Sequence, residues 1–204
     1  MPTPFTHPEG TRMNTAIDTA RSTAAPAMKA ITPPAIGTYW PGQGGIYVGI
    51  ARGADGQGDR HLIAARADAS AQRLQFGNYG TRIDDADSER DGAANTRALV
   101  AHGEHPAAAA CAAYTADGHS DFYLPSRREL ALCFANAAET FDAGGYYWSS
   151  TQYSRSGAFV QGFEGGGSGW YGKDLDCRVR ACRGLPLEPL NTLQPAVAAE
   201  GGAP

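Results

Sequence analysis

The feature that most constrains the fold is a change of sequence pattern at Gly144. Before it, the best-patterned segment has the 3.6-residue period of a helix. After it, short aromatic and β-branched runs alternate with glycine and serine, which is typical of antiparallel strands joined by turns. We therefore expect a glycine-rich antiparallel meander formed by GYYWSS, GAFVQGF, GWYGKDL and CRVRACR.

Upstream of the meander, the sequence predicts a hairpin followed by helices. IYVGIA (46–51) and HLIAAR (61–66) are joined by a loop rich in Gly and Asp, which favours a β-hairpin. Segments 91–102 and 105–116 have the alanine content of two helices, and Pro106 suits a first helical turn. The order of hairpin, two to three helices and meander predicts an α+β fold rather than a parallel sheet.

The helix immediately before the meander has the clearest start signal in the chain. Ser126 is a suitable N-cap, and Glu129 three residues later completes a capping box. The segment FYL (122–124) before it is predicted to be a short strand. One apolar helix face is expected from the spacing of Leu130, Cys133, Phe134 and Ala137.

Composition divides the chain into a central domain, 36–185, and two arms, 1–35 and 186–204. The first arm is dominated by Ala, Thr and Pro, and the second contains four prolines. Neither has enough apolar area to offset the entropy of ordering by itself. We expect extended arms that are either disordered or ordered on a partner or a second subunit.

Charge and hydropathy exclude several classes of protein. The 204 residues carry a net charge of −4, and the arginines are scattered, which argues against a nucleic-acid or anionic-membrane binder. No apolar run approaches the roughly 18 residues of a membrane span. Residues 1–20 lack the pattern of a secretory signal peptide, so we expect synthesis in the cytoplasm of the producing cell.

The sequence predicts no catalytic, metal or cofactor site. His102 and His105 lie at a helix junction without a recognisable third ligand, and His119 has no identifiable nucleophile partner. The run EGGGSG lacks the ending of a phosphate-binding loop and is interpreted as a hairpin turn. The four cysteines are expected to be reduced and buried; a continuous strand would place Cys177 and Cys182 on opposite faces.

Two arginines, Arg178 and Arg180, share one face of the predicted terminal strand 177–183. Such a face either meets water or supplies buried ion pairs. We expect Arg180 to pair with a carboxylate such as Glu129, as a structural clamp between the terminal strand and the helix.

Several of these segments together resemble the DUF1566 family. YLPSRREL (123–130), YYWSSTQYS (146–154), AFVQGFEGG (158–166) and CRVRACRGL (177–185) occur in the order of that family's LP[ST]xxEL, YWSST and VRxVR segments. WPGQGGIYVGIARG and HLIAA resemble its phage and prophage branch. The resemblance covers about Trp40 to Leu185.

The resemblance implies a C-type-lectin-like fold, shared with formylglycine-generating enzymes and with receptor-binding proteins of diversity-generating retroelements. It implies a non-enzymatic virion protein, in a phage tail, fibre or capsid decoration, bound through its arms to other virion subunits. Its lectin-like surface would contact a host glycan, a host protein or a neighbouring subunit. We expect a homo-oligomer, namely a trimer for a fibre-like location. The alternatives are an oxidase related to formylglycine-generating enzymes and a bacterial surface adhesion module.

The meander therefore supplies the candidate site. Tyr and Trp give rigid contact area while Ser and Gly give adaptable hydrogen bonding, as in antibody paratopes. Trp148, Phe159 and Phe163 are assigned to the core. The alternative for the remaining residues is an ordinary solvated rim. The predicted contact face consists of Tyr153, Arg155, Gln161, Glu164, Trp170, Tyr171, Lys173 and Asp174.

Overall fold

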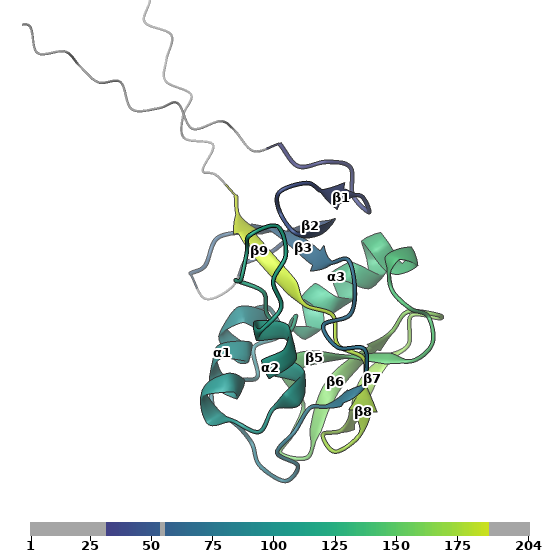
Figure 1. Ribbon diagram of the computed structural model, residues 1–204. Coiled ribbons are helices and arrows are strands. Elements are labelled where there is room, and N and C mark those ends of the chain that lie inside the picture. The colour runs from purple at the N-terminus through teal and green to yellow at the C-terminus, as the bar shows by residue number, and fades with distance from the viewer. Residues whose placement is uncertain (1–31, 54–55, 188–204) are drawn as a thin grey trace, which may run out of the picture. The chain divides into compact units, whose positions relative to one another are not determined.

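One sheet brings the first strands and the last strand of the domain together (Figure 1). Strands β1 (Tyr39–Trp40), β2 (Gly45–Ala51), β3 (Arg60–Ala65) and β9 (Cys182–Pro186) form it in the antiparallel order β1-β2-β3-β9. The predicted hairpin is thus confirmed. Gly45 is required there because a Cβ at this position would lie 2.2 Å from the Ala64 carbonyl oxygen.

This computed structural model describes residues 32–53 and 56–187. Most of the predicted arms, 1–31 and 188–204, lies outside these residues. The described chain is mixed α+β, with three α-helices and antiparallel sheets. None of the helices described is long and apolar enough to cross a lipid bilayer.

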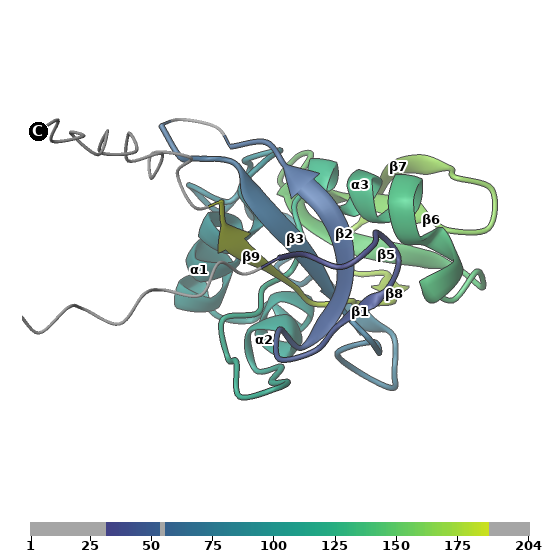
Figure 2. The same ribbon diagram turned by 90° about the horizontal axis from the view of Figure 1, so that it is seen from above.

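Two of the predicted helices pack side by side (Figures 1 and 2). Helix α1 (Gly92–His102) is preceded by its N-cap, Asp91, whose side chain accepts a hydrogen bond from the Ala94 N–H. Helix α2 (Pro106–Ala112) has Pro106 in its first turn, as predicted, but ends earlier than the expected residue 116. Ala116 instead exchanges backbone hydrogen bonds with His119.

The capping-box prediction for helix α3 (Arg127–Ala137) is confirmed. The Ser126 hydroxyl accepts from the Glu129 N–H, and the Glu129 carboxylate accepts from the Ser126 N–H at 2.8 Å. The predicted strand 122–124 is wrong: only Tyr123 is bridged, to Cys182. Of the expected apolar face, Leu130, Cys133 and Ala137 are buried and Phe134 is half-buried. A short 3-10 helix, η1 (Ala138–Thr140), follows.

Three of the four segments predicted for the meander pair as a sheet, and the fourth, 177–183, lies outside it. Strands β5 (Tyr146–Gln152), β6 (Gly157–Gly162) and β7 (Ser168–Gly172) pair in sequence order. Two short strands, β4 (Leu74–Gln75) and β8 (Asp176–Cys177), form a separate pair. Helix α3 contacts β2 as well as β5 and β6, so it joins this sheet to the first one.

The prediction of one continuous strand over 177–183 is wrong. The segment begins in β8 and ends in β9, and its backbone bonds change partner on the way. Arg178 exchanges backbone hydrogen bonds with β5, whereas the carbonyls of Val179 and Ala181 accept from Ala69 and Ala65. The segment therefore crosses from one sheet to the other.

The alternation predicted for this segment nevertheless holds in the core. Cys177, Val179 and Ala181 pack in a cluster that contains Trp148, whereas Cys182 packs in a second cluster with Leu130. Trp148 is fully buried, as predicted. All four cysteines are free and buried, as expected.

The predicted pairing of Arg180 with Glu129 is wrong. Arg180 Nε donates to Asp68 Oδ1 at 2.8 Å, and Glu129 instead accepts from Arg60 at 2.6 Å. Arg180 also donates to the carbonyls of Ala65 and Thr140. The clamp therefore exists, but it connects the terminal segment to the loop after β3 and to η1.

Candidate binding surface on the meander sheet

Tyr153 and Trp170 form an exposed aromatic stack on the meander. Their ring centroids are 5.1 Å apart and their planes differ by 10°, while the residues are 51% and 54% exposed. Phe159 meets the Tyr153 ring edge-on at 5.5 Å. We call these three residues the aromatic platform. Large exposed rings gathered in one place are typical of contact surfaces, because they bury much area with few rotatable bonds.

The strand register positions the platform. Phe159 of β6 lies directly opposite Trp170 of β7, so both side chains emerge on the same face. Tyr153 follows β5 in a tight turn that the Ser154 hydroxyl fixes by accepting from the Ser156 and Gly157 N–H groups. A Cβ on Gly157 would lie 3.0 Å from Trp170 Cε3, so this glycine makes room for the indole ring.

Charge is placed at the edge of the platform by Arg127. Its guanidinium lies 4.2 Å from the centroid of the Phe159 ring and donates to Glu89 Oε1 at 2.9 Å. The attraction of a cation for the ring face holds both groups in position. Arg155 is exposed in the same turn as Tyr153. The platform thus combines apolar ring faces with the exposed cation of Arg155, while the Arg127 charge is paired with Glu89.

Sequence reasoning missed Arg127 and assigned Phe159 to the core. Phe159 is only half-buried, and its ring is covered by Tyr153 and Arg127 rather than by the interior. The alternation along 157–163 predicted that Phe159 and Phe163 share a face, but only Phe163 reaches the core. No local signal linked Arg127 to Phe159, since they are far apart in the sequence.

Of the eight predicted contact residues, the structure brings only some together. Tyr153, Arg155 and Trp170 gather at one part of the sheet, and Asp174 is exposed in the turn after β7. Glu164 is exposed, but it follows β6 at the opposite end of the sheet from Tyr153. The remaining three are covered to different degrees: Tyr171, Gln161 and Lys173.

The expected exposure of Gln161 is wrong. It is 6% exposed, and its side-chain amide donates to the carbonyls of Gly162 and Gly166 at 2.9 and 3.1 Å. Its role is to fix the glycine-rich turn between β6 and β7. Tyr171 is half-buried and packs against Tyr146, with 4.9 Å between their ring centroids.

The expected exposure of Lys173 is also wrong, because the loop 76–83 covers it. Its ammonium donates to the Thr81 carbonyl and to Gln152 Oε1, both at 2.7 Å, and lies 5.3 Å from the Phe76 ring centroid. Burial lowers the pKa of Lys173 to about 8. No carboxylate contacts this ammonium in the described chain.

The cysteines and histidines of the described residues could in principle supply metal ligands or reactive thiols. Within 32–53 and 56–187, no three His, Cys, Asp or Glu residues are grouped to hold a metal ion. Burial raises the pKa of Cys177 to about 12 and that of Cys111 further. The Cys182 thiol is also held protonated by its Cys133 neighbour, with 3.9 Å between the sulfur atoms. These thiols are therefore not reactive thiolates at neutral pH.

Comparison with known proteins gives no assignment for this surface. No family model matches the chain, and no curated protein matches it.

Proposed function

We propose that this chain is a non-enzymatic binding component of a phage virion, with a C-type-lectin-like fold, that contacts a glycan on the host surface. The observation that carries the proposal is the exposed stack of Tyr153 on Trp170. The apolar C–H faces of a sugar ring fit such coplanar aromatic surfaces. The neighbouring Ser and Gly residues and Arg155 offer hydrogen bonds to hydroxyl groups.

The topology supports the lectin-like part of the proposal. The last strand returns to pair with β3, so the two ends of the domain close one sheet. Helix α3 contacts both this sheet and the meander sheet, and Trp148, Ala158 and Val160 of the meander pack into a buried core cluster. This arrangement gives a stable base that presents a separate sheet for contact, as the resemblance to the DUF1566 phage branch implies.

The state of the thiols favours binding over the oxidase alternative. That chemistry requires a reactive, accessible cysteine pair, and all four cysteines are buried. Cys177 and Cys182, the pair closest in sequence, belong to different core clusters. The platform, in contrast, needs no reactive group to act as a contact surface.

Tryptophan fluorescence tests the glycan part of the proposal. Trp170 is exposed, whereas Trp40 and Trp148 are 5% and 0% exposed, so acrylamide quenching reports mainly on Trp170. We expect purified bacterial surface polysaccharide to protect Trp170 from quenching in a saturable way. The Tyr153→Ala variant should bind about tenfold more weakly or worse, since stacked aromatic contacts contribute about 0.5–1.5 kcal/mol beyond their buried area.

Ile50→Ala is the matched control for this experiment. Ile50 is 47% exposed but lies on β2, outside the platform, so its replacement should leave protection unchanged. Equal loss in both variants, or no protection by polysaccharides from a range of bacteria, would contradict the glycan proposal.

The virion part has a separate test. An antibody against the folded domain should label phage particles released from the producing bacterium, as seen by immunogold electron microscopy. Labelling of the bacterial surface without particles would instead support the adhesion alternative.

A further inference from the structure

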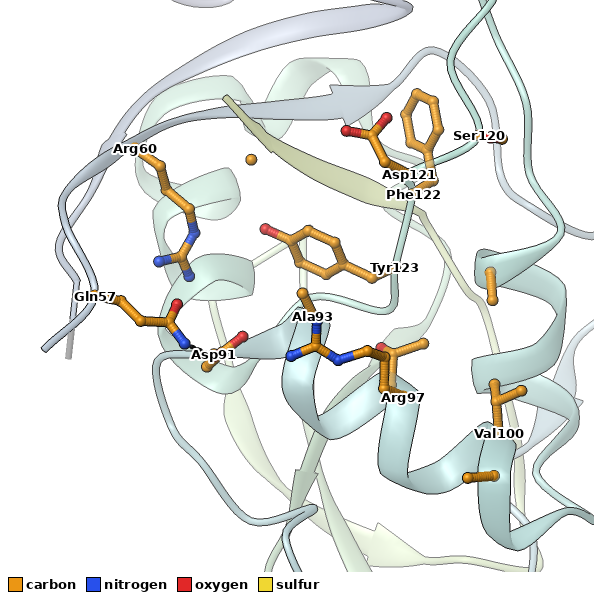
Figure 3. A pocket seen from close by; sticks show the side chains of 14 residues that line it. Gln57, Arg60, Asp91, Ala93, Arg97, Val100, Ser120, Asp121, Phe122 and Tyr123 are labelled. Carbon is orange, nitrogen blue, oxygen red and sulfur yellow. Dashed lines mark hydrogen bonds between the residues drawn. The ribbon is translucent and has the colours of Figure 1, made fainter. Parts of the chain in front are cut away.

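A pocket of about 600 Å³ lies between α1, the end of α2 and the segment 120–123 (Figure 3). Its walls are mostly apolar and come from Ala93, Val100 and Ala101 of α1, Ala112 of α2, and Phe122. No platform residue lines it. The volume is within the range of small-molecule sites.

Three charged side chains of the pocket are already satisfied within the protein. Arg60 donates to Glu129 Oε1, Asp121 accepts two bonds from Arg183, and Asp91 caps α1. The Tyr123 hydroxyl donates to Glu129 at 2.7 Å, and burial raises the pKa of Tyr123 well above its usual value. These groups form the wall of the pocket, and each of the charged ones already has a partner within the protein.

Arg97 differs from the other charged residues that line the pocket. It projects from α1, and its guanidinium lies below the Tyr123 ring in Figure 3. Among the residues that the structure describes, no hydrogen bond or ion pair is made by this side chain. Arg97 is exposed, so its guanidinium is accessible to a ligand at the open side of the pocket, where it can donate charge-assisted hydrogen bonds to an anionic group.

We propose that this pocket binds a small amphipathic anion, whose apolar body fills the space between α1 and α2 while its carboxylate or sulfonate pairs with Arg97. The apolar walls supply affinity for the body, and Arg97 supplies the selectivity for a negative charge. This site is independent of the proposed glycan contact.

Two dyes of the same shape separate the two contributions. 1-Anilinonaphthalene-8-sulfonate has an apolar body with one sulfonate, and N-phenyl-1-naphthylamine has the same body without it. We expect fluorescence titration to show tighter binding of the sulfonate dye by about 10- to 100-fold, the range for a charge-assisted hydrogen bond of about 1.5–3 kcal/mol. The Arg97→Ala variant should lose this preference and still bind the neutral dye.

Arg155→Ala is the matched control, because it removes the same charge from an exposed position on the meander. It should keep the preference for the sulfonate dye. Arg97 is exposed on a helix, so Arg97→Glu should also fold, reject the sulfonate dye and retain the neutral one. Ala112→Phe should fill the pocket and weaken both dyes at least tenfold, and circular dichroism checks that each variant is folded.

The proposal is overturned if the folded wild-type protein binds neither dye, or binds both equally. It is also overturned if Arg97→Ala and Arg155→Ala reduce sulfonate binding to the same extent, which would indicate general charge attraction. Tyr153→Ala serves to identify the site: loss of dye binding in that variant would place the dye on the platform and refute the pocket, without bearing on glycan binding.

Discussion

At the scale of single residues, Lys173 combines full burial with a lowered pKa, and this has a direct consequence for stability. Its ammonium is buried and is held by two neutral oxygens, from Thr81 and Gln152, and by the face of Phe76. Removing a cation from water without a carboxylate partner is costly, and the cost appears as the lowered pKa of about 8. The fold tolerates this because both oxygens accept short hydrogen bonds.

The lowered pKa of Lys173 predicts that the free energy of unfolding rises with pH between about 8 and 10.5. In that range the unfolded lysine, with its ordinary pKa of 10.5, binds more protons than the folded one, so raising the pH favours the folded state. The gain should reach about 3 kcal/mol near pH 10.5. Below about pH 8 both states are protonated, and Lys173 contributes no slope.

The measurement is urea unfolding across this pH range, comparing wild type with Lys173→Met. Tyrosines and cysteines that titrate in the same range are common to both proteins, so their effects cancel in the difference. If the difference in free energy of unfolding between wild type and Lys173→Met does not change with pH, Lys173 has its ordinary pKa in the folded protein.

Gly166 gives a second prediction at this scale. Its φ is 74°, and a Cβ there would lie 2.5 Å from Phe134 Cζ, in the turn that Gln161 fixes. Gly166→Ala should therefore lower the free energy of unfolding by about 1–3 kcal/mol, through backbone strain and displacement of the Phe134 ring. The neighbouring Gly165→Ala is the control, because a Cβ there meets nothing within 4 Å. Thermal unfolding of both variants measures the difference, and equal losses would contradict this account.

At the scale of elements, Asp68 joins the terminal segment to the meander. It accepts from Arg178 at 3.0 Å, from Arg180 at 2.8 Å and from the Tyr147 hydroxyl at 3.1 Å. Arg180 is only 5% exposed and also lies 4.6 Å from the Phe141 ring centroid. A buried arginine needs its carboxylate, so this loop residue holds β5 and the crossing segment in place.

Asp68→Asn should lower the free energy of unfolding by about 3–5 kcal/mol, because it leaves the Arg180 charge buried without a counter-ion. Asp142→Asn is the matched control. Asp142 also pairs with Arg178, at 2.6 Å, but its side chain is 49% exposed, so the expected loss is below about 1 kcal/mol. Chemical denaturation of the two variants measures both values. A small loss for Asp68→Asn would mean that Arg180 is adequately solvated.

The contrast between Glu129 and Arg180 explains which elements could be predicted from sequence. The capping box depends on two residues three apart, so a local pattern is sufficient to predict it. The partner of Arg180 lies 112 residues away in a loop without any periodic pattern. Lys173 was expected to be exposed because it lies beside glycine-rich turns, but the loop that covers it comes from a distant part of the chain.

For the aromatic platform, the sequence was sufficient to predict that Tyr153 and Trp170 are exposed contact residues. The stacking of their rings and the position of Arg127 depend on tertiary packing, which no local pattern encodes.

At the scale of the whole molecule, β9 closes the domain. It pairs with β3 from Arg60↔Pro186 to Ala64↔Cys182, and the Cys182 backbone bonds reciprocally with Tyr123. Arg183 of the same strand makes two hydrogen bonds to Asp121. Strand β9 thus contacts both the β2-β3 hairpin and the segment leading into α3. In the sequence these two parts are separated by α1 and α2.

A chain that ends after Ala181 should therefore not fold cooperatively, although it keeps the three described α-helices and the β5-β6-β7 sheet. Loss of β9 would expose the backbone groups of β3 and remove the buried Cys182 side chain from the α3 cluster. A chain that ends after Leu187 keeps β9 and should unfold with the same sigmoidal transition as the full chain. Urea denaturation followed by circular dichroism and by tryptophan fluorescence distinguishes the two chains. Cooperative unfolding of the shorter chain would mean that the meander and α3 form an independent folding unit, and that β9 is only an accessory strand.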